Sequence, residues 1–430
     1  MPRRPIAADA AIATAAALAV VEPNNTGLGG DCFALYFDAE TKRISALNGS
    51  GRSPAALTIE RLAREGLADG WPSDHAHTVT VPGACAGWFD LLERHGSMSM
   101  ETLLAPAIRL ADDGFPVAPF NSRLWEIGVR TQLHRSRGGR ELMIDGRAPR
   151  PGERFRNPTL ADSLRTIASG GRDAFYRGPI GEKVVAAVRE HGGALAMEDL
   201  SSHVSTWDEP ISVEYRGLRV WECPPNGQGI ASLLALNLLR QLDLAGQDPL
   251  GPERLHLLIE AMRLAFADAR HHVADPAKQA VPTEALLSPA YAAERLALLD
   301  PRRASLDVRY GSPFASSDTV YFCCVDARGN ACSFINSNYQ AFGTGIVAQG
   351  TGFSLQNRGF GFSLDPAHPN ALAPGKRPYH TIIPGLITRE VDGSLWGPFG
   401  VMGGFMQPQG HVQVLLALLD DAADPRKDFT

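Results

Sequence analysis

The spacing of apolar positions predicts a helix, a glycine-rich turn and a hairpin at the start of the chain. Small apolar residues fill Ala7–Val21 and Pro23 follows them, so this stretch is predicted to form a buried helix that ends near the proline. Asn24–Asp31 is rich in glycine and asparagine, which is typical of a turn. Cys32–Asp38 and Arg43–Asn48 have strand-like composition on either side of a polar turn, so we expect a β-hairpin.

Helical spacing dominates the middle of the chain, together with one further hairpin. The predicted helices are Gly83–Gly114, Thr159–Ala168, Pro179–His191, Met197–His203, Gly229–Leu242 and Pro252–Ala274. Ile211–Tyr215 and Leu218–Glu222 are the predicted strands of the hairpin. The polar stretch Leu299–Ser317 contains two prolines and several arginines and serines, which indicates an exposed linker.

After this linker the pattern changes to strands. Thr319–Val325 is a nearly continuous apolar run, as expected of a strand covered on both faces. Asp326–Asn330 provides a turn, and Ala331–Asn336 is predicted to run back beside the first strand. The remaining predicted elements are strands near His380–Thr388 and Leu395–Pro398 and a helix over Gln407–Leu419. Strand-rich layers flanked by helices favour an α+β sandwich of two sheets between helical layers.

The charge and the cysteines exclude several classes of protein. A net charge of −6 at pH 7 gives no basic surface for nucleic acid. Six cysteines are scattered without a CxxC pair, so neither a zinc knuckle nor a thioredoxin-type site is indicated. Cys323 and Cys324 are adjacent in an apolar run, and we interpret all six cysteines as buried thiols in a reducing compartment. No window has the length and apolarity of a membrane span.

Common catalytic signatures are missing from the sequence. There is no G-x-S-x-G elbow, H-E-x-x-H pair, Walker A loop or dinucleotide fingerprint. Gly27–Gly30 lacks the strand-to-helix context of a phosphate loop, which favours a turn. His271-His272 could bind a metal, but no carboxylate or cysteine cluster lies at ligand spacing. We therefore expect neither a metal nor a cofactor.

One threonine lies at the junction of the linker and the apolar strand. In Ser316-Ser317-Asp318-Thr319, cleavage before Thr319 would free its α-amino group, whose reference pKa of about 8 suits a base beside its own hydroxyl. The alternative is a threonine that only starts a strand.

Several short motifs occur together in an order found in one family. In chain order they are Ala10–Pro23 with Gly27–Gly30, Val81–Ala84 with Gly87-Trp88, Leu104–Ala111 with Gly114-Phe115, Asp318-Thr319, Val325-Asp326 with Gly329–Ala331, Phe342–Gly345, Lys376–Pro378 and Gly403-Gly404. From Ala7 to Gln413 the chain thus resembles the gamma-glutamyltransferases, also called gamma-glutamyltranspeptidases or glutathione hydrolases.

The resemblance implies a four-layer αββα fold of the N-terminal-nucleophile hydrolase type and a zymogen that cuts itself between Asp318 and Thr319. Residues 1–318 would form the heavy chain and residues 319–430 the light chain of a heterodimer. Thr319 would take an acyl group from a small amide or gamma-glutamyl substrate, as in glutathione metabolism, and release it to water or an amine. No nucleic-acid or membrane partner is implied.

The resemblance also assigns site residues. Ser337 stands where the family usually has a supporting threonine hydroxyl. Gly403-Gly404 would give backbone N–H groups to the developing oxyanion, the alternative being a tight turn before a helix. The family's substrate-binding arginine falls on Ser50, with Arg52 two residues further on. The family's asparagine after the hydroxyl falls on Tyr339, next to Asn338, so Arg52, Asn338 and Tyr339 are candidates for substrate binding.

Other positions depart from the family. The amide and acidic groups that hold the substrate's ammonium group fall on Arg358 and Gly361, and the serine pair becomes His380-Thr381. An arginine repels an ammonium group and attracts a carboxylate, so we predict a preference for an anionic acyl group over a gamma-glutamyl group. The short stretch from Asn357 to Lys376 implies a lidless, acylase-like branch. A glutaryl or cephalosporin-type acylase is therefore the alternative enzyme.

Both ends are expected to be short relative to the family, before the first helix and after Leu419. An uncut, inactive relative that persists as a precursor or binding protein is thus the third hypothesis. The expected location is cytoplasmic, because Asp9 interrupts the apolar N-terminal stretch and no signal cleavage site follows it. A periplasmic or secreted location is the alternative, because the N-terminus is expected to be short.

Overall fold

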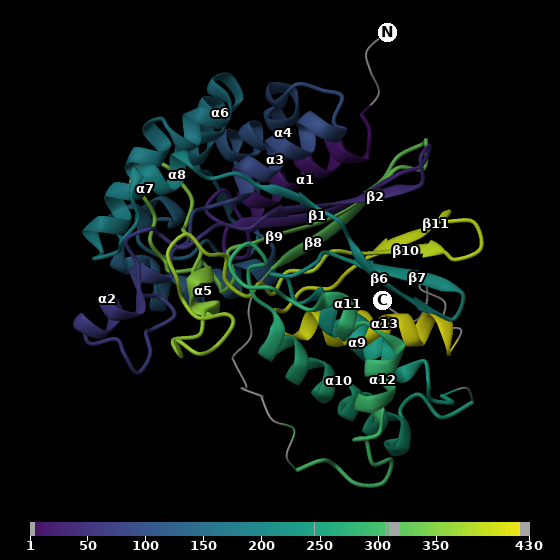
Figure 1. Ribbon diagram of the computed structural model, residues 1–430. Helices are drawn as coiled ribbons and strands as arrows, with labels where there is room; N and C mark the ends of the chain where they lie inside the picture. Colours follow the sequence, from purple (N-terminus) through teal and green to yellow (C-terminus); the bar gives the residue numbers. More distant parts are fainter. Residues whose placement is uncertain (1–4, 245, 307, 309–318, 422–430) are drawn as a thin grey trace.

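Two antiparallel sheets lie at the centre of the computed structural model, which describes residues 5–244, 246–306, 308 and 319–421 (Figure 1). In spatial order the first sheet consists of β5 (Thr206–Asp208), β2 (Arg43–Gly49), β1 (Asp31–Asp38), β9 (Ala331–Ser337) and β8 (Val320–Val325). The second consists of β11 (Leu395–Phe399), β10 (Gly385–Arg389), β7 (Leu218–Glu222) and β6 (Ile211–Tyr215). Segments on both sides of residues 309–318 therefore share the first sheet.

Successive side chains of β1 point to opposite faces of the first sheet, so they belong to different parts of the core. Phe33 and Leu35 pack with Leu386 and other apolar residues of the second sheet. Cys32 and Ala34, which point the opposite way, pack among helices. The core therefore has one apolar layer between the sheets and one on the outer face of each sheet.

Helices cover the two outer faces, as Figure 1 shows. The first sheet is covered by α1 (Ala7–Val21), α3 (Ala84–His95), α4 (Met100–Asp113), α6 (Pro158–Tyr176) and α7 (Pro179–Glu190). The second is covered by α9 (Gly229–Leu239), α10 (Pro252–His272), α12 (Pro289–Leu296) and α13 (Met406–Leu419). Every residue of α9 is buried, which agrees with its almost entirely apolar sequence. The fold is mixed α+β, as predicted.

Shorter elements connect these layers. They are α2 (Ile59–Arg64), α5 (Pro119–Thr131), α8 (Met197–Ser201), α11 (Thr283–Leu286), β3 (Phe115–Pro116), β4 (Arg154–Phe155) and the 3₁₀ turns η1 (Ala76–Thr78), η2 (Leu133–Arg135), η3 (Arg137–Leu142) and η4 (Arg358–Gly361). No helix within the described ranges is long and apolar enough to cross a bilayer.

Several predicted boundaries were wrong for local reasons. The range Gly83–Gly114 forms two helices, because the chain is extended at Gly96 and Ser99 caps the second helix by accepting from the Thr102 N–H. The strand expected from His380 begins only at Gly385. The helix α5 and the short strand β5 were not predicted. Of the predicted linker, residues 307 and 309–317 lie outside the described residues.

The apolar run after the linker was also interpreted wrongly. β8 pairs with β9 alone and forms an edge of the first sheet in the described part of the chain, and its residues after Val320 are half-buried or exposed, so neither of its faces is fully covered. Cys323 and Val325 are exposed and Cys324 is half-buried, whereas the other four cysteines are buried. Apolar composition does not distinguish an edge strand from a central one, because the number of neighbours depends on the sheet order.

His203 makes the stability of the fold depend on pH. Its ring is buried and stacked on Tyr176 at 5.4 Å, and neither ring nitrogen has a partner among the described residues. Burial lowers the pKa of His203 to about 3. Below about pH 6.5 the unfolded chain binds a proton here that the native chain does not, so stability falls as pH falls.

A His203→Phe variant is therefore expected to lose less stability than wild type between pH 7 and pH 5. Below pH 6.5, the free energy of unfolding of the wild type should fall with pH more steeply than that of the variant, by up to about 1.4 kcal/mol per pH unit. This value corresponds to one proton bound by the unfolded chain. Urea unfolding at pH 7, 6 and 5 measures it. An equal change in the free energy of unfolding with pH in the two proteins would contradict the role of His203 in the pH dependence.

Candidate active site

Strand pairing places Thr319 beside Ser337. β8 and β9 are antiparallel, with Val320 opposite Asn336, so the residue before β8 lies next to the last residue of β9. Both side chains are buried, and Thr319 Oγ1 lies 3.2 Å from Ser337 Oγ. These two predicted residues therefore meet within hydrogen-bond distance, whereas Asp318 lies outside the described residues.

Tyr339 connects this hydroxyl pair to a buried arginine. Its N–H donates to Ser337 Oγ at 2.8 Å, and its φ of 78° marks a tight turn directly after β9. The ring of Tyr339 lies over the guanidinium of Arg358, with 4.2 Å between Arg358 Cζ and the ring centre. Arg358 Nη1 in turn donates to Thr381 Oγ1 at 2.7 Å. The structure thus brings together Thr319, Ser337, Tyr339, Arg358 and Thr381.

Arg358 is fully buried at the start of η4. Burial lowers its pKa to about 10, which the nearby Asp31 charge opposes, so the guanidinium is charged at pH 7. Its Nε and Nη2 atoms have no hydrogen-bond partner among the described residues.

Asp31, at the start of β1, forms the centre of a buried polar network. Its Oδ1 accepts hydrogen bonds from the N–H groups of Gly51 and Gly83, at 3.0 and 3.1 Å, and from Gln356 Nε2 at 2.9 Å. Its Oδ2 lies 3.0 Å from His380 Nε2. Burial alone would raise the pKa of Asp31, but the His380 hydrogen bond and the charge of Arg358 help to hold it below its usual value.

His380 is held in one neutral form. Burial, with a smaller effect of Arg358, lowers the pKa of His380 to about 3. The Ile382 N–H donates to Nδ1 at 3.4 Å, so Nε2 carries the proton that faces Asp31. His380 therefore orients Asp31 and adds no positive charge near Arg358 at pH 7.

Gly403 and Gly404 form the turn before α13. Their φ angles are 115° and 56°, a region that favours glycine. Gln228 Nε2 donates to the carbonyls of Gly404 and Thr381, at 2.8 and 2.7 Å, which places the turn beside the Arg358 cluster. Neither glycine N–H donates a backbone hydrogen bond within the described part. The turn is thus compatible with either predicted role.

Asn338 and Arg52 are placed differently. Asn338 is buried, its N–H donates to the Asn25 carbonyl at 3.1 Å, and its Oδ1 has no partner among the described residues. Arg52 is half-buried and donates to the Val204 carbonyl at 3.1 Å. No hydrogen bond joins Arg52 to the Thr319–Arg358 cluster in the described chain, and its substrate role stays a prediction.

Sequence reasoning missed three residues of the network, namely Asp31, Gln228 and Gln356. All three are fully buried polar side chains that hold the site together. Asp31 had a local signal, because an acidic residue directly after Gly29-Gly30 and before an apolar strand needs a partner when buried. The two glutamines had none, because their partners are distant in the sequence.

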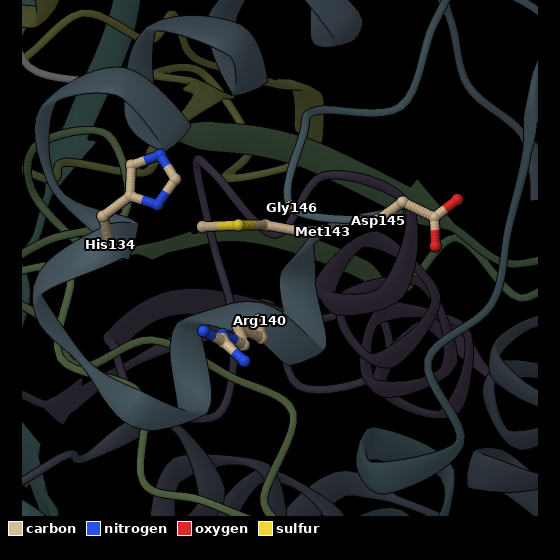
Figure 2. Close-up of a pocket in the computed structure, with 5 residues that line it drawn as sticks. All are labelled: His134, Arg140, Met143, Asp145 and Gly146. Atoms are coloured by element: carbon tan, nitrogen blue, oxygen red, sulfur yellow. The ribbon is translucent and has the colours of Figure 1, made fainter.

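No group of three or more potential metal ligands is present in the described ranges. His271 and His272 lie in the last turn of α10. A surface pocket of about 550 Å³ lies elsewhere, around η2 and η3. Figure 2 shows its lining residues, which are His134, Arg140, Met143, Asp145 and Gly146. None of them belongs to the cluster around Thr319, so this pocket is not the candidate active site.

Comparison with known proteins identifies the family. The family model described as Gamma-glutamyltranspeptidase matches residues 6–429. The chain belongs to the gamma-glutamyltranspeptidase family. Among the curated relatives, the "Glutathione hydrolase-like YwrD proenzyme" of Bacillus subtilis (strain 168) is 38% identical over 419 residues, which cover 97% of this chain and 78% of the relative.

Other members of the gamma-glutamyltranspeptidase family differ in their named substrates. The "Oxamate amidohydrolase proenzyme" of Klebsiella pneumoniae subsp. pneumoniae is 36% identical over 412 residues, covering 94% of this chain and 75% of the relative. The crystal structure of a cephalosporin acylase from Bacillus halodurans is 43% identical, with a TM-score of 0.89, and the match covers 98% of this chain and 77% of that structure. Membership of a family with proenzyme hydrolases supports an N-terminal-nucleophile amidohydrolase.

Proposed function

We propose that the chain is a self-cleaving amide hydrolase or acyltransferase that forms an acyl-enzyme on Thr319. The observation that carries the proposal is the buried hydroxyl pair, with Thr319 Oγ1 3.2 Å from Ser337 Oγ at the start of β8. Membership of the gamma-glutamyltranspeptidase family supports it, because its relatives include hydrolase proenzymes.

Self-cleavage would create the catalytic group. Thr319 Oγ1 attacks the carbonyl carbon of Asp318, the peptide C–N bond breaks, and the Asp318 acyl group moves to Oγ1 as an ester. Water then hydrolyses the ester, which leaves an Asp318 carboxylate and a free Thr319 α-amino group. That amine has a reference pKa of about 8 and can act as the base for its own hydroxyl.

Turnover would repeat this chemistry on an external amide. The α-amine accepts the Oγ1 proton as Oγ1 attacks the substrate carbonyl, and the Gly403 and Gly404 N–H groups would stabilise the oxyanion. The leaving amine takes the proton, and water or another amine releases the acyl group from Oγ1. Ser337 would hold Oγ1 in position for both steps.

The sheet order explains how two pieces would stay together. We infer that the helix, sheet, sheet and helix layers form the αββα sandwich of N-terminal-nucleophile hydrolases. Residues 1–318 would be the heavy chain and residues 319–430 the light chain. β9 of the light chain pairs with β1 of the heavy chain over seven residue pairs, so cleavage before Thr319 leaves the first sheet intact.

Intact-mass analysis of the purified protein tests the proposal. We expect two pieces whose masses correspond to residues 1–318 and 319–430, with Thr319 as the new N-terminus. A single uncut chain without amidase activity would contradict the proposal and favour the hypothesis of an inactive precursor or binding protein.

Ser337 offers a test of the hydroxyl pair. Ser337→Ala removes the contact with Thr319 Oγ1 and leaves the buried Tyr339 N–H without its acceptor. We expect kcat to fall about 30-fold, corresponding to an interaction of about 2 kcal/mol. Hydrolysis of an acyl anilide by the cleaved protein measures this.

Ser333→Ala is the matched control. Ser333 is another buried serine on β9, and its hydroxyl lies 3.1 Å from the Tyr321 hydroxyl, outside the site. This variant should keep wild-type kcat, and Ser337→Thr should keep most of it because the hydroxyl remains. Equal activity of Ser337→Ala and wild type would remove Ser337 from the mechanism.

A cephalosporin-type or glutaryl acylase is the second candidate function. The cephalosporin acylase structure supports it at 43% identity, and so does the buried Arg358 near the hydroxyl pair. The two candidate functions differ in the acyl donor, because a gamma-glutamyl group carries an ammonium group beside its carboxylate and a glutaryl group carries the carboxylate alone.

A further inference from the structure

One edge of the Arg358 guanidinium has no partner among the described residues. The side chain is fully buried, yet its Nε and Nη2 atoms make no hydrogen bond to any residue that the structure describes. Buried polar groups in native proteins are almost always hydrogen-bonded, and an unpaired charged donor is especially unfavourable. Two such donors on one side chain therefore need an explanation.

The rest of the guanidinium is fixed in place. Nη1 donates to Thr381 Oγ1 at 2.7 Å, and the Tyr339 ring covers one face with its centre 4.2 Å from Cζ. Nε–H and Nη2–H lie in the guanidinium plane on the same side, so the stacked ring does not block them. The two unpaired donors form the side-on fork that matches the two oxygens of a carboxylate.

We propose that Nε and Nη2 of Arg358 bind a carboxylate at the far end of the acyl donor. The preferred substrates would be amides of dicarboxylic acids in which one carboxyl group is free and no ammonium group is present. This proposal rests on the proposed function, because Thr319 has to attack the amide end of the same molecule. Tyr339 supports the connection, since its N–H contacts Ser337 Oγ and its ring contacts Arg358.

An ammonium group has no matching charge in this cluster. Asp31 is the carboxylate of the network, and both of its oxygens are occupied. Three donors contact Oδ1, and His380 contacts Oδ2. The unpartnered oxygens in the described chain near it, Asn338 Oδ1 and Gln356 Oε1, are neutral amide acceptors. A gamma-glutamyl group carries its ammonium beside its carboxylate, so binding of that carboxylate would place the ammonium next to Arg358, where the described residues of the cluster offer no further anion.

Three p-nitroanilides of equal acyl chain length test the proposal in the wild-type protein. Glutaryl anilide carries the distal carboxylate, pentanoyl anilide replaces it with a methyl group, and gamma-L-glutamyl anilide adds an ammonium group. We expect kcat/KM for the glutaryl compound to exceed that for the pentanoyl compound by about 100-fold and that for the gamma-glutamyl compound by at least about 10-fold. Faster turnover of either comparison compound would overturn the proposal.

Variants of Arg358 test whether this side chain causes the preference for an acyl group with a distal carboxylate. Arg358→Gln should lower the ratio of glutaryl to pentanoyl turnover about 100-fold, whereas Arg358→Lys should recover only part of that ratio because lysine lacks the fork of two parallel N–H donors. The control is Arg219→Gln on β7, where the guanidinium pairs with Glu390 near the surface. This control should keep the wild-type ratio of glutaryl to pentanoyl turnover. An unchanged ratio in Arg358→Gln would overturn the proposal.

Ligand binding separates this proposal from the proposed function. Glutarate should raise the melting temperature of the wild-type protein, while pentanoate at the same concentration should not, and Arg358→Gln should remove the difference. Absence of self-cleavage would contradict the proposed function alone. A self-cleaved protein that neither binds glutarate nor hydrolyses the glutaryl anilide would overturn the carboxylate site alone.

Discussion

A Thr319→Ala chain is expected to stay in one piece and to lose amide hydrolysis almost completely. The substitution removes the hydroxyl that would attack the Asp318 carbonyl, so neither the new α-amine nor the acyl-enzyme can form. We expect kcat to fall by about 10⁴-fold or more relative to the self-cleaved wild type, as for other removed nucleophiles. Intact mass and anilide hydrolysis on the same preparations measure both effects.

Two further variants distinguish the loss of the nucleophile from a loss of the folded structure. Thr319→Ser keeps a hydroxyl and should still cut itself and turn over, more slowly than wild type. Thr351→Ala removes the hydroxyl of another buried threonine, which donates to the Ala348 carbonyl, and should leave cleavage and activity unchanged. Cleavage between residues 318 and 319 in Thr319→Ala would exclude this threonine as the nucleophile of maturation.

Elements with strong local signals were predicted well. The helix over Ala7–Val21 has the predicted bounds, and the hairpin of β6 and β7 likewise agrees with its prediction. Turns, caps and apolar spacing lie within a few residues of one another, so the sequence shows them directly. By contrast, β5 has only three residues, and its pairing with β2 depends on contacts about 160 residues away.

The candidate site was predictable only where motifs marked it. The hydroxyl pair followed from the family motifs, and the pairing of β8 with β9 places Thr319 and Ser337 together. The network around Asp31 was not predictable, because Gly83, Gln356 and His380 reach it from distant segments. Composition also could not show that β8 is an edge strand within the described residues.

Asp31→Asn is expected to destabilise the protein by about 3–5 kcal/mol, because it removes a buried carboxylate that makes four hydrogen bonds and balances the nearby charge of Arg358. Asparagine would present its NH₂ group either to the three donors at Oδ1 or to the His380 Nε2–H, so one contact becomes repulsive. The charge of Arg358 would also lose the carboxylate that stabilises it. Urea unfolding measures the stability, and the self-cleaved fraction reports whether the site still assembles.

Asp9→Asn is the control, because it removes a buried, hydrogen-bonded carboxylate that does not balance the charge of Arg358. Asp9 is also fully buried and accepts hydrogen bonds from Ile6, Ser97 and Met98, but it is not among the charges that act on Arg358. Its variant should therefore lose only about 1–3 kcal/mol. Adding Arg358→Met to Asp31→Asn removes the uncompensated charge, so the double variant should be more stable than Asp31→Asn alone. Urea unfolding gives the loss in free energy of unfolding for Asp31→Asn, for Arg358→Met and for the double variant. If the loss of the double variant equals the sum of the two single losses, Asp31 acts only through its hydrogen bonds.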